Sequence, residues 1–490
     1  MIALDFLLEA TGGTAWRTHE SVFHGVAIDG RSVGRGGVWF AIRGERFDGH
    51  LFASQAIDAG AACLCIERGR AAELILPGDV TIVEVDDTVQ ALGRLARAHR
   101  LRLPELVVIA VTGSYGKTTT KEIAASILAA HAGHAAVHKT EGNFNNHLGL
   151  PLTLLRLTEA HRFAVIEMGM SAPGEIAYLA ELAVPDLGAI VSVGPVHLEH
   201  LGSLAAIAHA KGELFAALPP SGALVFPDGD ALIAAEAKTS RAQRKLRFGT
   251  RAGVDVRILE ARVSAEGTLV TLRLPDGTRV EGTLAAIGAH HAHNAAAAAA
   301  LCSAAGASPQ AIARGLAGAA SGKHRSTIVE VGGRHVLDDC YNASPPSTVA
   351  ALDALRDLRS SSPLPSRAIA VLGDMLELGP DAPMLHRNIG EHAAARADAV
   401  WGLGPLAREI VAGARRAGMP ADRARASDDP EAIAADLAKS TQPGDWILVK
   451  ASRGMKLERV IDALRAALQQ SAPAASHNEP PASQQSPGGA

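Results

Sequence analysis

Residues 106–120 read LVVIAVTGSYGKTTT, and the rest of the chain is best interpreted around this stretch. Its first half, at 107–111, is an apolar run rich in β-branched residues, which predicts a buried strand. Glycines at 113 and 116 then form a loop, and helix-forming residues follow at 121–125. A strand, a glycine-rich loop and a helix in this order predict an anion cradle, because backbone N–H groups and the positive end of the helix dipole converge there.

The residues of this loop indicate that the anion is a nucleotide triphosphate. Lys117 would reach the terminal phosphates, and the hydroxyl of Thr118 could ligate Mg²⁺. The general pattern GxxxxGK[ST] places a glycine at position 111, where this chain has Val111, and the first glycine comes at Gly113. A Gly-Lys-Thr run also occurs by chance in loops after strands, so the alternative is a loop without a ligand.

The composition narrows the class of protein. The chain has 490 residues, which suggests about three domains, and its net charge of −4 gives no general attraction to nucleic acid or to an anionic membrane. Its 4 cysteines include no C-x-x-C pair of the kind used for zinc or redox chemistry. The first residues lack the cationic and long apolar segments of a signal peptide, and the most apolar window, 294–305, is too short to span a membrane. We therefore expect a cytoplasmic protein with no membrane insertion and no nucleic-acid partner.

Three α/β domains are predicted along the chain. Short apolar runs that alternate with Gly and Arg turns indicate a small N-terminal α/β domain at 1–102. A central P-loop-type domain with a parallel sheet is expected at 103–320, with a β-rich insertion between about 222 and 281. Strands that alternate with helices predict a Rossmann-like parallel sheet at 321–469. The Pro-, Ser- and Gln-rich end at 470–490 is expected to be a disordered tail.

Polar residues follow three of the predicted central strands at the points where the strands end. Thr118, Glu167 and His197 each come a few residues after a strand-like apolar run. The carboxyl ends of parallel strands meet at one edge of a sheet, so these side chains should lie together and could bind Mg²⁺. For His197 a purely structural role is an equal alternative.

Other polar residues have both a functional and a structural interpretation. The asparagines in the loop at 140–151 could bind a polar ligand or hold turns with positive φ. The paired acids Asp338 and Asp339 could bind a ribose, a metal or an ammonium group, or cap the next helix. Lys211 could be a solvated lysine on a helix face. The three histidines at 290–293 have no partner cluster with zinc-ligand spacing.

Five motifs together resemble the Mur ligase family of ATP-dependent amide ligases in peptidoglycan precursor synthesis. They are TGSYGKTTTKE, GERFDGHLF, EGNFNNHLGLPLTLL, LDDCYNASP and VLGDMLELG, and the likeness spans about residues 22–465. The last four are similar to the branch that joins D-alanyl-D-alanine to UDP-N-acetylmuramoyl-tripeptide through an acyl phosphate. The branch that adds the third residue typically has a DNPR-like motif in its C-terminal domain, and this chain has none. We expect a monomer that takes those two substrates together with ATP and Mg²⁺.

The resemblance implies roles for individual residues. Those that would hold ATP are Gly113, Ser114, Tyr115, Gly116, Lys117, Thr118 and Thr119, with Asn294 at the adenine and with Arg325 and Asp339 approaching from the C-terminal domain. Those with a catalytic role are Lys117, Glu167, His197 and Lys211, and the metal ligands would be Thr118, Glu167 and His197. In relatives the lysine at the position of Lys211 is often carbamylated, and a carbamate would turn this cation into an anionic support for Mg²⁺. Those facing the UDP-muramoyl substrate are Asn145, Asn146, Asp29, Arg31, Asp48 and His50, although the acids at 29 and 48 could instead stabilise solvated turns.

Three positions depart from the family pattern. Gly30 stands where serine is usual in DSR, His291 where the adenine motif usually has asparagine, and Ala451 where glycine is usual in KGS. None of them is the loop lysine or a predicted metal ligand, so the chemistry should survive. The alternatives left open are a folylpolyglutamate-type ligase or a different Mur branch, and a nucleotide-binding protein that has lost catalysis.

Overall fold

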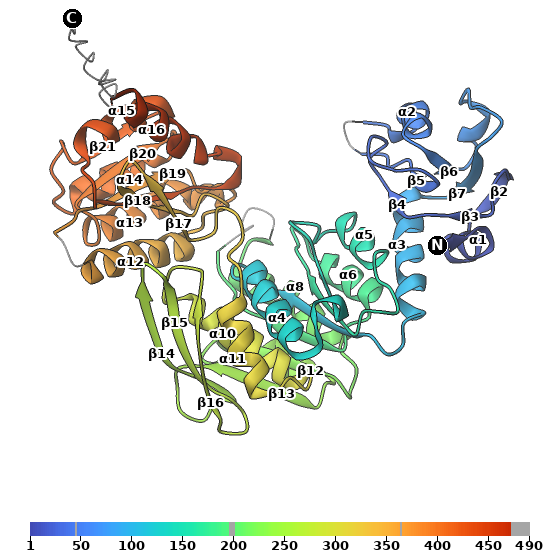
Figure 1. The fold of residues 1–490 in the computed structure, drawn as a ribbon, viewed down its shortest axis with the longest axis horizontal. Helices are drawn as coiled ribbons and strands as arrows, with labels where there is room; N and C mark the ends of the chain where they lie inside the picture. The colour runs from blue at the N-terminus through green and yellow to red at the C-terminus, as the bar shows by residue number, and fades with distance from the viewer. Residues whose placement is uncertain (45–46, 196–200, 363–364, 472–490) are drawn as a thin grey trace, which may run out of the picture.

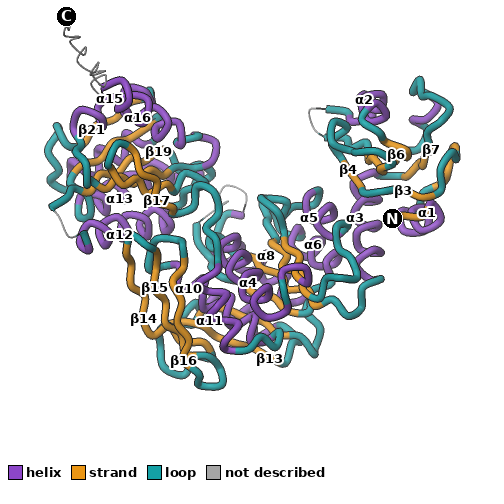
Figure 2. Tube along the Cα trace, viewed as in Figure 1, coloured by secondary structure: helices purple, strands orange, loops and turns teal. Residues whose placement is uncertain are grey.

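The computed structural model describes residues 1–44, 47–195, 201–362 and 365–471. Figure 1 shows three lobes in chain order, with the central lobe between the N-terminal and C-terminal lobes. Each lobe is built around its own sheet, and Figure 2 shows helices packed on these sheets. The α/β fold class and the three-part organisation predicted from the sequence are confirmed. No helix within the described ranges is long and apolar enough to cross a membrane.

The N-terminal lobe has a five-stranded sheet in the order β2-β7-β6-β5-β4, in which only β2 is antiparallel. Its central strand β6 is buried on both faces, because α1 and α3 cover one face and α2 covers the other. The side chain of Asp87 caps α3 by accepting a hydrogen bond from the N–H of Gln90. The elements are β1 (Ile2–Ala3), α1 (Leu4–Thr11), β2 (Thr14–Arg17), β3 (Val22–Phe23), β4 (Val26–Ala27), β5 (Gly37–Phe40), η1 (Gly49–Phe52), α2 (Ala53–Asp58), β6 (Ala61–Glu67), η2 (Arg70–Ala72), β7 (Thr81–Val85) and α3 (Thr88–Leu101).

The central lobe has a nine-stranded sheet in the order β16-β15-β14-β13-β12-β11-β8-β10-β9, and only the first two pairings in this order, β16 with β15 and β15 with β14, are antiparallel. One face carries α4, α10 and α11, and the other carries α5, α6 and α8. The elements are β8 (Val107–Thr112), α4 (Lys117–Ala132), η3 (His134–Ala136), β9 (Val137–Lys139), α5 (Gly149–Leu154), β10 (Phe163–Glu167), α6 (Glu175–Ala183), β11 (Leu187–Ile190), α8 (Leu204–Ala217), β12 (Ala223–Pro227), α9 (Ala231–Thr239), β13 (Arg244–Gly249), β14 (Val256–Ser264), β15 (Gly267–Arg273), β16 (Arg279–Leu284), α10 (His291–Ala304) and α11 (Pro309–Gly318).

The alanine-rich helix α10 lies in the middle of this lobe. The alanines from Ala295 to Ala300 are fully buried, and α10 packs against α4 and against several strands of the sheet. Short side chains allow the helix to approach its neighbours closely, since a larger residue would not fit at the density of a protein interior. The N-terminus of α10 is thereby fixed beside the loop between β8 and α4.

The C-terminal lobe has a six-stranded sheet in the order β17-β18-β22-β19-β20-β21, parallel except for the pair β17 and β18. Helices α12, α13 and α14 pack on one face and α15 and α16 on the other, as predicted for a Rossmann-like sheet. The elements are β17 (Thr327–Val331), β18 (Arg334–Asp338), α12 (Pro345–Ser361), β19 (Ala368–Gly373), η4 (Gly379–Asp381), α13 (Ala382–Ala394), β20 (Ala399–Leu403), α14 (Ala407–Arg416), β21 (Ala424–Ser427), α15 (Pro430–Ser440), β22 (Trp446–Lys450), η5 (Arg453–Met455) and α16 (Glu458–Ser471).

Two features of the fold differ from the sequence prediction. The strands at 222–281 do not form an insertion, because β12 pairs with β11 and the later strands extend the same central sheet. Helix α16 continues to Ser471, past the predicted start of the tail at 470, and residues 472–490 lie outside the described ranges. Because they belong to the central sheet, strands β12 to β15 form part of the surface on which α10 packs.

Candidate active site

The loop between β8 and α4 is held in one conformation by its glycines and by the strand beside it. Gly116 has φ +84°, and a Cβ there would lie 2.4 Å from Oδ1 of Asn294, so any other residue would strain the backbone and displace the Asn294 side chain. The backbone N–H of Tyr115 donates to Oγ of Ser192 at 2.9 Å. The hydroxyl of Ser114 donates to the carbonyl of Gly194 at 3.1 Å. The loop is therefore anchored to the segment that follows β11 and opens at the N-terminus of α4, as an anion cradle requires.

Lys117 begins α4 and points back over the loop. Its Nζ donates to the carbonyl oxygen of Gly113 at 2.7 Å. Burial lowers the pKa of Lys117, Glu167 opposes this shift, and Arg325 adds to it. The ammonium group thus lies at the opening of the cradle, where an anionic ligand would replace the carbonyl as its partner.

Thr118 and Glu167 lie in direct contact at the carboxyl edge of the central sheet, where the strand-end pattern places them. The Thr118 hydroxyl donates to Oε2 of Glu167 at 2.8 Å, and Nδ2 of Asn145 donates to Oε1 at 2.8 Å. Glu167 is almost completely buried. Two adjacent oxygen donors suit a small hard cation such as Mg²⁺, which completes its coordination with water and substrate oxygens.

The predicted third metal ligand, His197, lies outside the described residues. Within the described ranges there is no group of three or more His, Cys, Asp or Glu side chains that could hold a metal ion. The histidines at 290, 291 and 293 are among these described residues, so the structure gives no support to a zinc site there.

Lys211 projects from α8 and is buried, with only 2% of its surface exposed, so the alternative of a solvated lysine is wrong. Its ammonium group makes no hydrogen bond to any residue that the structure describes. Burial lowers the pKa of Lys211 well below its ordinary value, and repulsion from Lys117 acts in the same direction. A lysine in this state is readily deprotonated and is then a nucleophile.

Two cavities meet at the cradle. A cavity of about 820 Å³ lies between the central and C-terminal lobes, and one of about 580 Å³ lies beside α3 and α6. Lys117 and Asn145 line both. The predicted residues on the larger cavity are Ser114, Tyr115, Gly116, Lys117, Thr118, Thr119, Asn145, Glu167, Asn294, Arg325 and Asp339, and those on the smaller are Lys117, Asn145, Asn146 and Lys211. Ligands in the two cavities would therefore approach each other at the loop lysine.

The start of α10 contributes a row of imidazoles to the larger cavity. His290, His291, His293 and Asn294 line it, and the ring centroids of His290 and His291 lie 4.0 Å apart. Nδ2 of Asn294 lies 3.3 Å from Nδ1 of His291. Burial lowers the pKa of His290 to about 4 and also lowers the pKa of His291, so both rings are neutral near pH 7. Each neutral ring has one nitrogen that can donate a hydrogen bond and one that can accept a hydrogen bond from a ligand.

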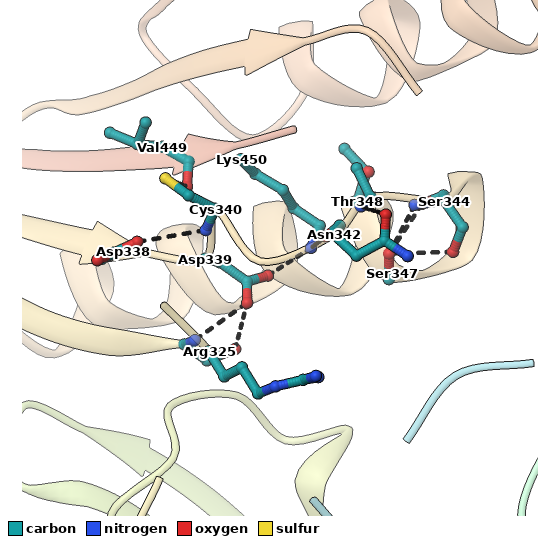
Figure 3. A network of polar contacts seen from close by, with 12 residues as sticks. Arg325, Asp338, Asp339, Cys340, Asn342, Ser344, Ser347, Thr348, Val449 and Lys450 are labelled. Atoms are coloured by element: carbon teal, nitrogen blue, oxygen red, sulfur yellow. Dashed lines mark hydrogen bonds and ion pairs between the residues drawn. The ribbon is translucent and has the colours of Figure 1, made fainter. Parts of the chain in front are cut away.

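Asp339 lines the same cavity, but both of its oxygens are engaged, as Figure 3 shows. Oδ1 accepts hydrogen bonds from the N–H and the hydroxyl of Ser326, at 3.0 and 3.2 Å. Oδ2 accepts from Nζ of Lys450 at 2.5 Å. The guanidinium of Arg325 lies 3.6 Å from the centroid of the Tyr341 ring. Lys450, which was not predicted from the sequence, is thus a partner of a predicted nucleotide contact. Its position at the carboxyl end of β22 could have indicated the site, but not its burial.

The predicted substrate residues of the N-terminal lobe form local contacts. Asp29 and Arg31 make an exposed ion pair at 2.8 Å. His50 is fully buried, with Nδ1 bonded to Oδ1 of Asp48 at 2.6 Å and Nε2 accepting from the N–H of Glu67 at 3.0 Å. His50 therefore has no free ring nitrogen for a ligand in this arrangement, which favours the turn-stabilising alternative. None of these four predicted residues is among the described residues that line the two cavities.

Asn146 also has a local role. Its Oδ1 accepts hydrogen bonds from the backbone N–H groups of Leu148 and Gly149, at 3.2 and 2.9 Å, at the start of α5. This is the capping role of asparagine at a helix start. The side-chain amide nitrogen of Asn146 is therefore the polar atom left to bind a ligand in the smaller cavity.

Comparisons with known proteins match this chain in all three lobes. Residues 22–100 match a model described as Mur ligase family, catalytic domain, residues 111–302 match the Mur ligase middle domain, and residues 324–453 match the Mur ligase, glutamate ligase domain. The chain is 37% identical to the UDP-N-acetylmuramoyl-tripeptide--D-alanyl-D-alanine ligase of Bacillus subtilis, over 90% of this chain and 93% of that protein. It is 36% identical to the protein of the same name from Escherichia coli, over 90% of this chain and 93% of that protein.

Solved structures show the same similarity. MurF from Acinetobacter baumannii superposes with a TM-score of 0.84 at 30% identity and covers 95% of this chain and 99% of its own. MurF ligase from Thermotoga maritima, solved in complex with ADP, has a TM-score of 0.79 at 30% identity and covers 92% of this chain and 99% of its own. Folylpolyglutamate synthase from Mycobacterium tuberculosis, at 16% identity and a TM-score of 0.60, covers 77% of this chain and 93% of its own and shares the fold alone.

Proposed function

The chain belongs to the Mur ligase family, and on that premise we propose that it joins D-alanyl-D-alanine to UDP-N-acetylmuramoyl-tripeptide in an ATP-dependent step of peptidoglycan precursor synthesis. The observation that carries this proposal is the meeting of two cavities at Lys117 and Asn145. A ligase must bring a nucleotide phosphate and an acceptor carboxylate into contact, and a nucleotide-binding protein without catalysis has no need of the second cavity.

We assign a role in binding to each part of the molecule. The N-terminal domain at 1–102 would bind the UDP end, the central domain at 103–320 would bind ATP, and the domain at 321–469 would complete the site. ATP would lie in the larger cavity with its phosphates at the loop from Gly113 to Thr119. The tripeptide carboxylate would enter from the smaller cavity, beside Lys211 and Asn145. The cytoplasmic location and the monomeric state expected from the sequence belong to the same proposal.

The chemistry needs activation of a carboxylate, because a carboxylate is a poor electrophile in water. A carboxylate oxygen attacks the γ-phosphorus of ATP, the bond to ADP breaks, and an acyl phosphate forms. The amine of D-alanyl-D-alanine then attacks the acyl carbon, phosphate leaves with the bonding electrons, and the amine loses a proton. Two anions must first approach each other, so Lys117 contributes by neutralising charge and by holding the phosphate in line.

Thr118 and Glu167 are the described residues that would hold Mg²⁺, since their oxygens lie 2.8 Å apart at the loop. When bound, Mg²⁺ would neutralise part of the phosphate charge and polarise the γ-phosphorus. Glu167 is kept in place for this task by Asn145 on its other oxygen.

We also propose that Lys211 carries a carbamate. Its lowered pKa favours the neutral amine, which adds to CO₂ to give a carbamate anion and a released proton. Lys211→Ala should lose most activity and should recover part of it with added short carboxylic acids, which supply the missing carboxylate. Lys238→Ala, at an exposed lysine of α9, is the control and should need no rescue. Full activity of Lys211→Ala without any acid would contradict the carbamate.

The function itself is tested by phosphate release from ATP with each component omitted in turn. We expect turnover only when UDP-N-acetylmuramoyl-tripeptide and D-alanyl-D-alanine are both present. Turnover with L-amino acids or with folate and glutamate would identify another branch. Nucleotide binding without turnover on any acceptor would identify a binding protein.

A further inference from the structure

A second lysine of the loop helix, Lys121, lies one helical turn after Lys117 and is almost completely inaccessible to solvent, with 1% of its surface exposed. A buried ammonium group loses its hydration, so it is tolerated only where charged or hydrogen-bonding partners replace the water. Lysine on a helix is ordinarily a surface residue. The burial of Lys121 therefore calls for a specific set of partners, and the structure provides one.

The ammonium group of Lys121 contacts three elements at once. Its Nζ donates to the carbonyl oxygen of Thr140 at 2.7 Å and lies 3.0 Å from Oε1 of Glu122. It also lies 4.0 Å from Oε2 of Glu167, the same oxygen that accepts the hydroxyl of Thr118. Lys121 therefore joins α4, the loop after β9 and the end of β10 at one point.

Lys121 also holds Glu167 indirectly, through Thr140. The hydroxyl of Thr140, whose carbonyl Lys121 binds, accepts the backbone N–H of Glu167 at 2.9 Å. From the other residues that the structure describes, the side chain of Glu167 receives neutral donors, from Thr118 and Asn145. Lys117 is occupied with the carbonyl of Gly113. Among the described residues, Lys121 is thus the cation that forms an ion pair with Glu167.

We propose that Lys121 is a positioning residue for the cation site: it fixes both the backbone and the carboxylate of Glu167, so that Oε2 is presented beside the hydroxyl of Thr118. This inference rests on the proposed role of Thr118 and Glu167 as the cation-binding pair. Partners that orient a metal ligand from behind commonly change metal affinity by about 10–100-fold when they are removed. Lys121 touches neither cavity, so its effect on nucleotide must act through Glu167.

The test compares Lys121→Met with Lys139→Met. Methionine has similar length without the charge. Lys139 pairs with the same acid, Glu122, but is half exposed and makes no ion pair with Glu167. In each variant, binding of a non-hydrolysable ATP analogue is measured by calorimetry with and without Mg²⁺, and phosphate release is measured against Mg²⁺ concentration. Because Glu122 keeps Lys139 as a partner, removing Lys121 does not leave that acid alone.

We expect Lys121→Met to raise the Mg²⁺ concentration at half-maximal rate by roughly tenfold or more, in line with the effect of other supporting residues. It should also abolish most of the gain in nucleotide affinity that Mg²⁺ gives, while affinity without Mg²⁺ changes little. Lys139→Met should behave as the unmodified protein does. In a Glu167→Gln background, Lys121→Met should cause no further loss of Mg²⁺ dependence, because the carboxylate that it positions is gone.

Equal effects of Lys121→Met in the two backgrounds, or a lower melting temperature with an unchanged Mg²⁺ requirement, would overturn the inference. If Lys121→Met does not fold, Lys121→Gln keeps a donor for the Thr140 carbonyl and removes the charge, and an unchanged Mg²⁺ requirement in that variant overturns it as well. Failure of the proposed function looks different. In that case the unmodified protein itself shows no Mg²⁺-dependent nucleotide binding or no ligase turnover.

Discussion

At the scale of single residues, the cradle depends on Gly116 for two separate reasons. The backbone has φ +84°, which L side chains adopt at a cost of about 1–2 kcal/mol, and a Cβ would lie 2.4 Å from the side-chain oxygen of Asn294. The first reason concerns only stability. The second concerns the ligand, because Asn294 is a predicted adenine contact and lines the larger cavity.

A comparison of Gly116→Ala with Gly69→Ala separates these two reasons. Gly69 has nearly the same backbone, with φ +85°, and nothing lies within 4 Å of a Cβ built there. Both variants should lose about 1 kcal/mol of stability from the backbone. Only Gly116→Ala should also weaken binding of an ATP analogue, by about tenfold or more, because small misplacements in a site are costly. Calorimetric titration measures this, and equal affinities for the two variants would refute the contact with Asn294.

The lowered pKa of His290 predicts that the folded protein loses stability in acid. Burial lowers the pKa of His290 from 6.5 to about 4, with the nearby Asp339 and Asp353 opposing the shift and Lys450 and His293 adding to it. Because the unfolded chain then binds the proton more tightly, the stabilisation is fully present above pH 6.5 and is lost as the pH falls towards 4. Between pH 7 and pH 5 the loss amounts to about 2 kcal/mol.

The variant His290→Gln should therefore reduce the difference between urea unfolding curves recorded at pH 7 and at pH 5. A matched control is His209→Gln, since His209 is an exposed side chain on α8. If His290→Gln keeps the full acid sensitivity of the unmodified protein, other groups are responsible for it.

The residues that the sequence predicted at the cradle could be found because they follow apolar runs at strand ends. Thr118 and Glu167 follow this rule, and they are in contact. Lys121 and Lys450 were missed, since a lysine within a helix or after a strand gives no sign of its burial in the local pattern. Their partners, Thr140 and Asp339, lie 19 and 111 residues away in the sequence, on other elements of the fold. Burial of that kind is a property of the tertiary fold.

At the scale of elements, the parallel sheets were predictable and the pairing at their edges was not. The apolar runs at 107–111 and 163–166 became β8 and β10 almost unchanged. The strands at 222–281 were predicted as an insertion, although they continue the central sheet through β12. Alternating polar and apolar residues identify a strand, but they do not say which neighbour it pairs with, because the partner is set by packing on α10 and α11.

The linker between the central and C-terminal lobes contains two non-glycine residues with positive φ. His324 and Ser326 have φ +59° and +49°, which is uncommon outside glycine. Each is held by one of the paired acids at the end of β18. Nδ1 of His324 lies 2.6 Å from Oδ2 of Asp338, and Ser326 donates to Asp339. Arg325 lies between them, so the two contacts set where its guanidinium enters the larger cavity.

Asp339→Asn should disturb this linker through Lys450. The variant keeps an oxygen for Ser326 but leaves the ammonium of Lys450, which is 3% exposed, without its carboxylate. An unpaired buried charge costs about 3–5 kcal/mol, so the urea midpoint of the C-terminal lobe should fall markedly, as followed by Trp401 and Trp446 fluorescence. Adding Lys450→Met should restore much of the stability without restoring ATP turnover. A double variant no more stable than Asp339→Asn would argue against the ion pair as the cause.

At the scale of the whole molecule, the nucleotide site is divided between lobes. Figure 1 shows the C-terminal lobe connected to the central lobe through the linker before β17, with the N-terminal lobe on the opposite side. Arg325 and Asp339 line the larger cavity from the C-terminal side, while the loop and Asn294 line it from the central side. A ligand that binds both sides at once favours whichever lobe arrangement brings them closest. Closure would also keep water from an acyl phosphate.

We therefore expect the radius of gyration in solution to fall when an ATP analogue, Mg²⁺ and UDP-N-acetylmuramoyl-tripeptide are added together, as measured by small-angle scattering. AMP in place of the analogue should leave the radius unchanged, because it lacks the β- and γ-phosphates that would join the cradle to the C-terminal side. Arg325→Ala should bind the analogue but compact less, since its guanidinium is the cation that the linker carries into the cavity. If the fully liganded protein scatters as the free protein does, the lobes are already in their working arrangement, and Arg325 must act on the nucleotide without any movement of the C-terminal lobe.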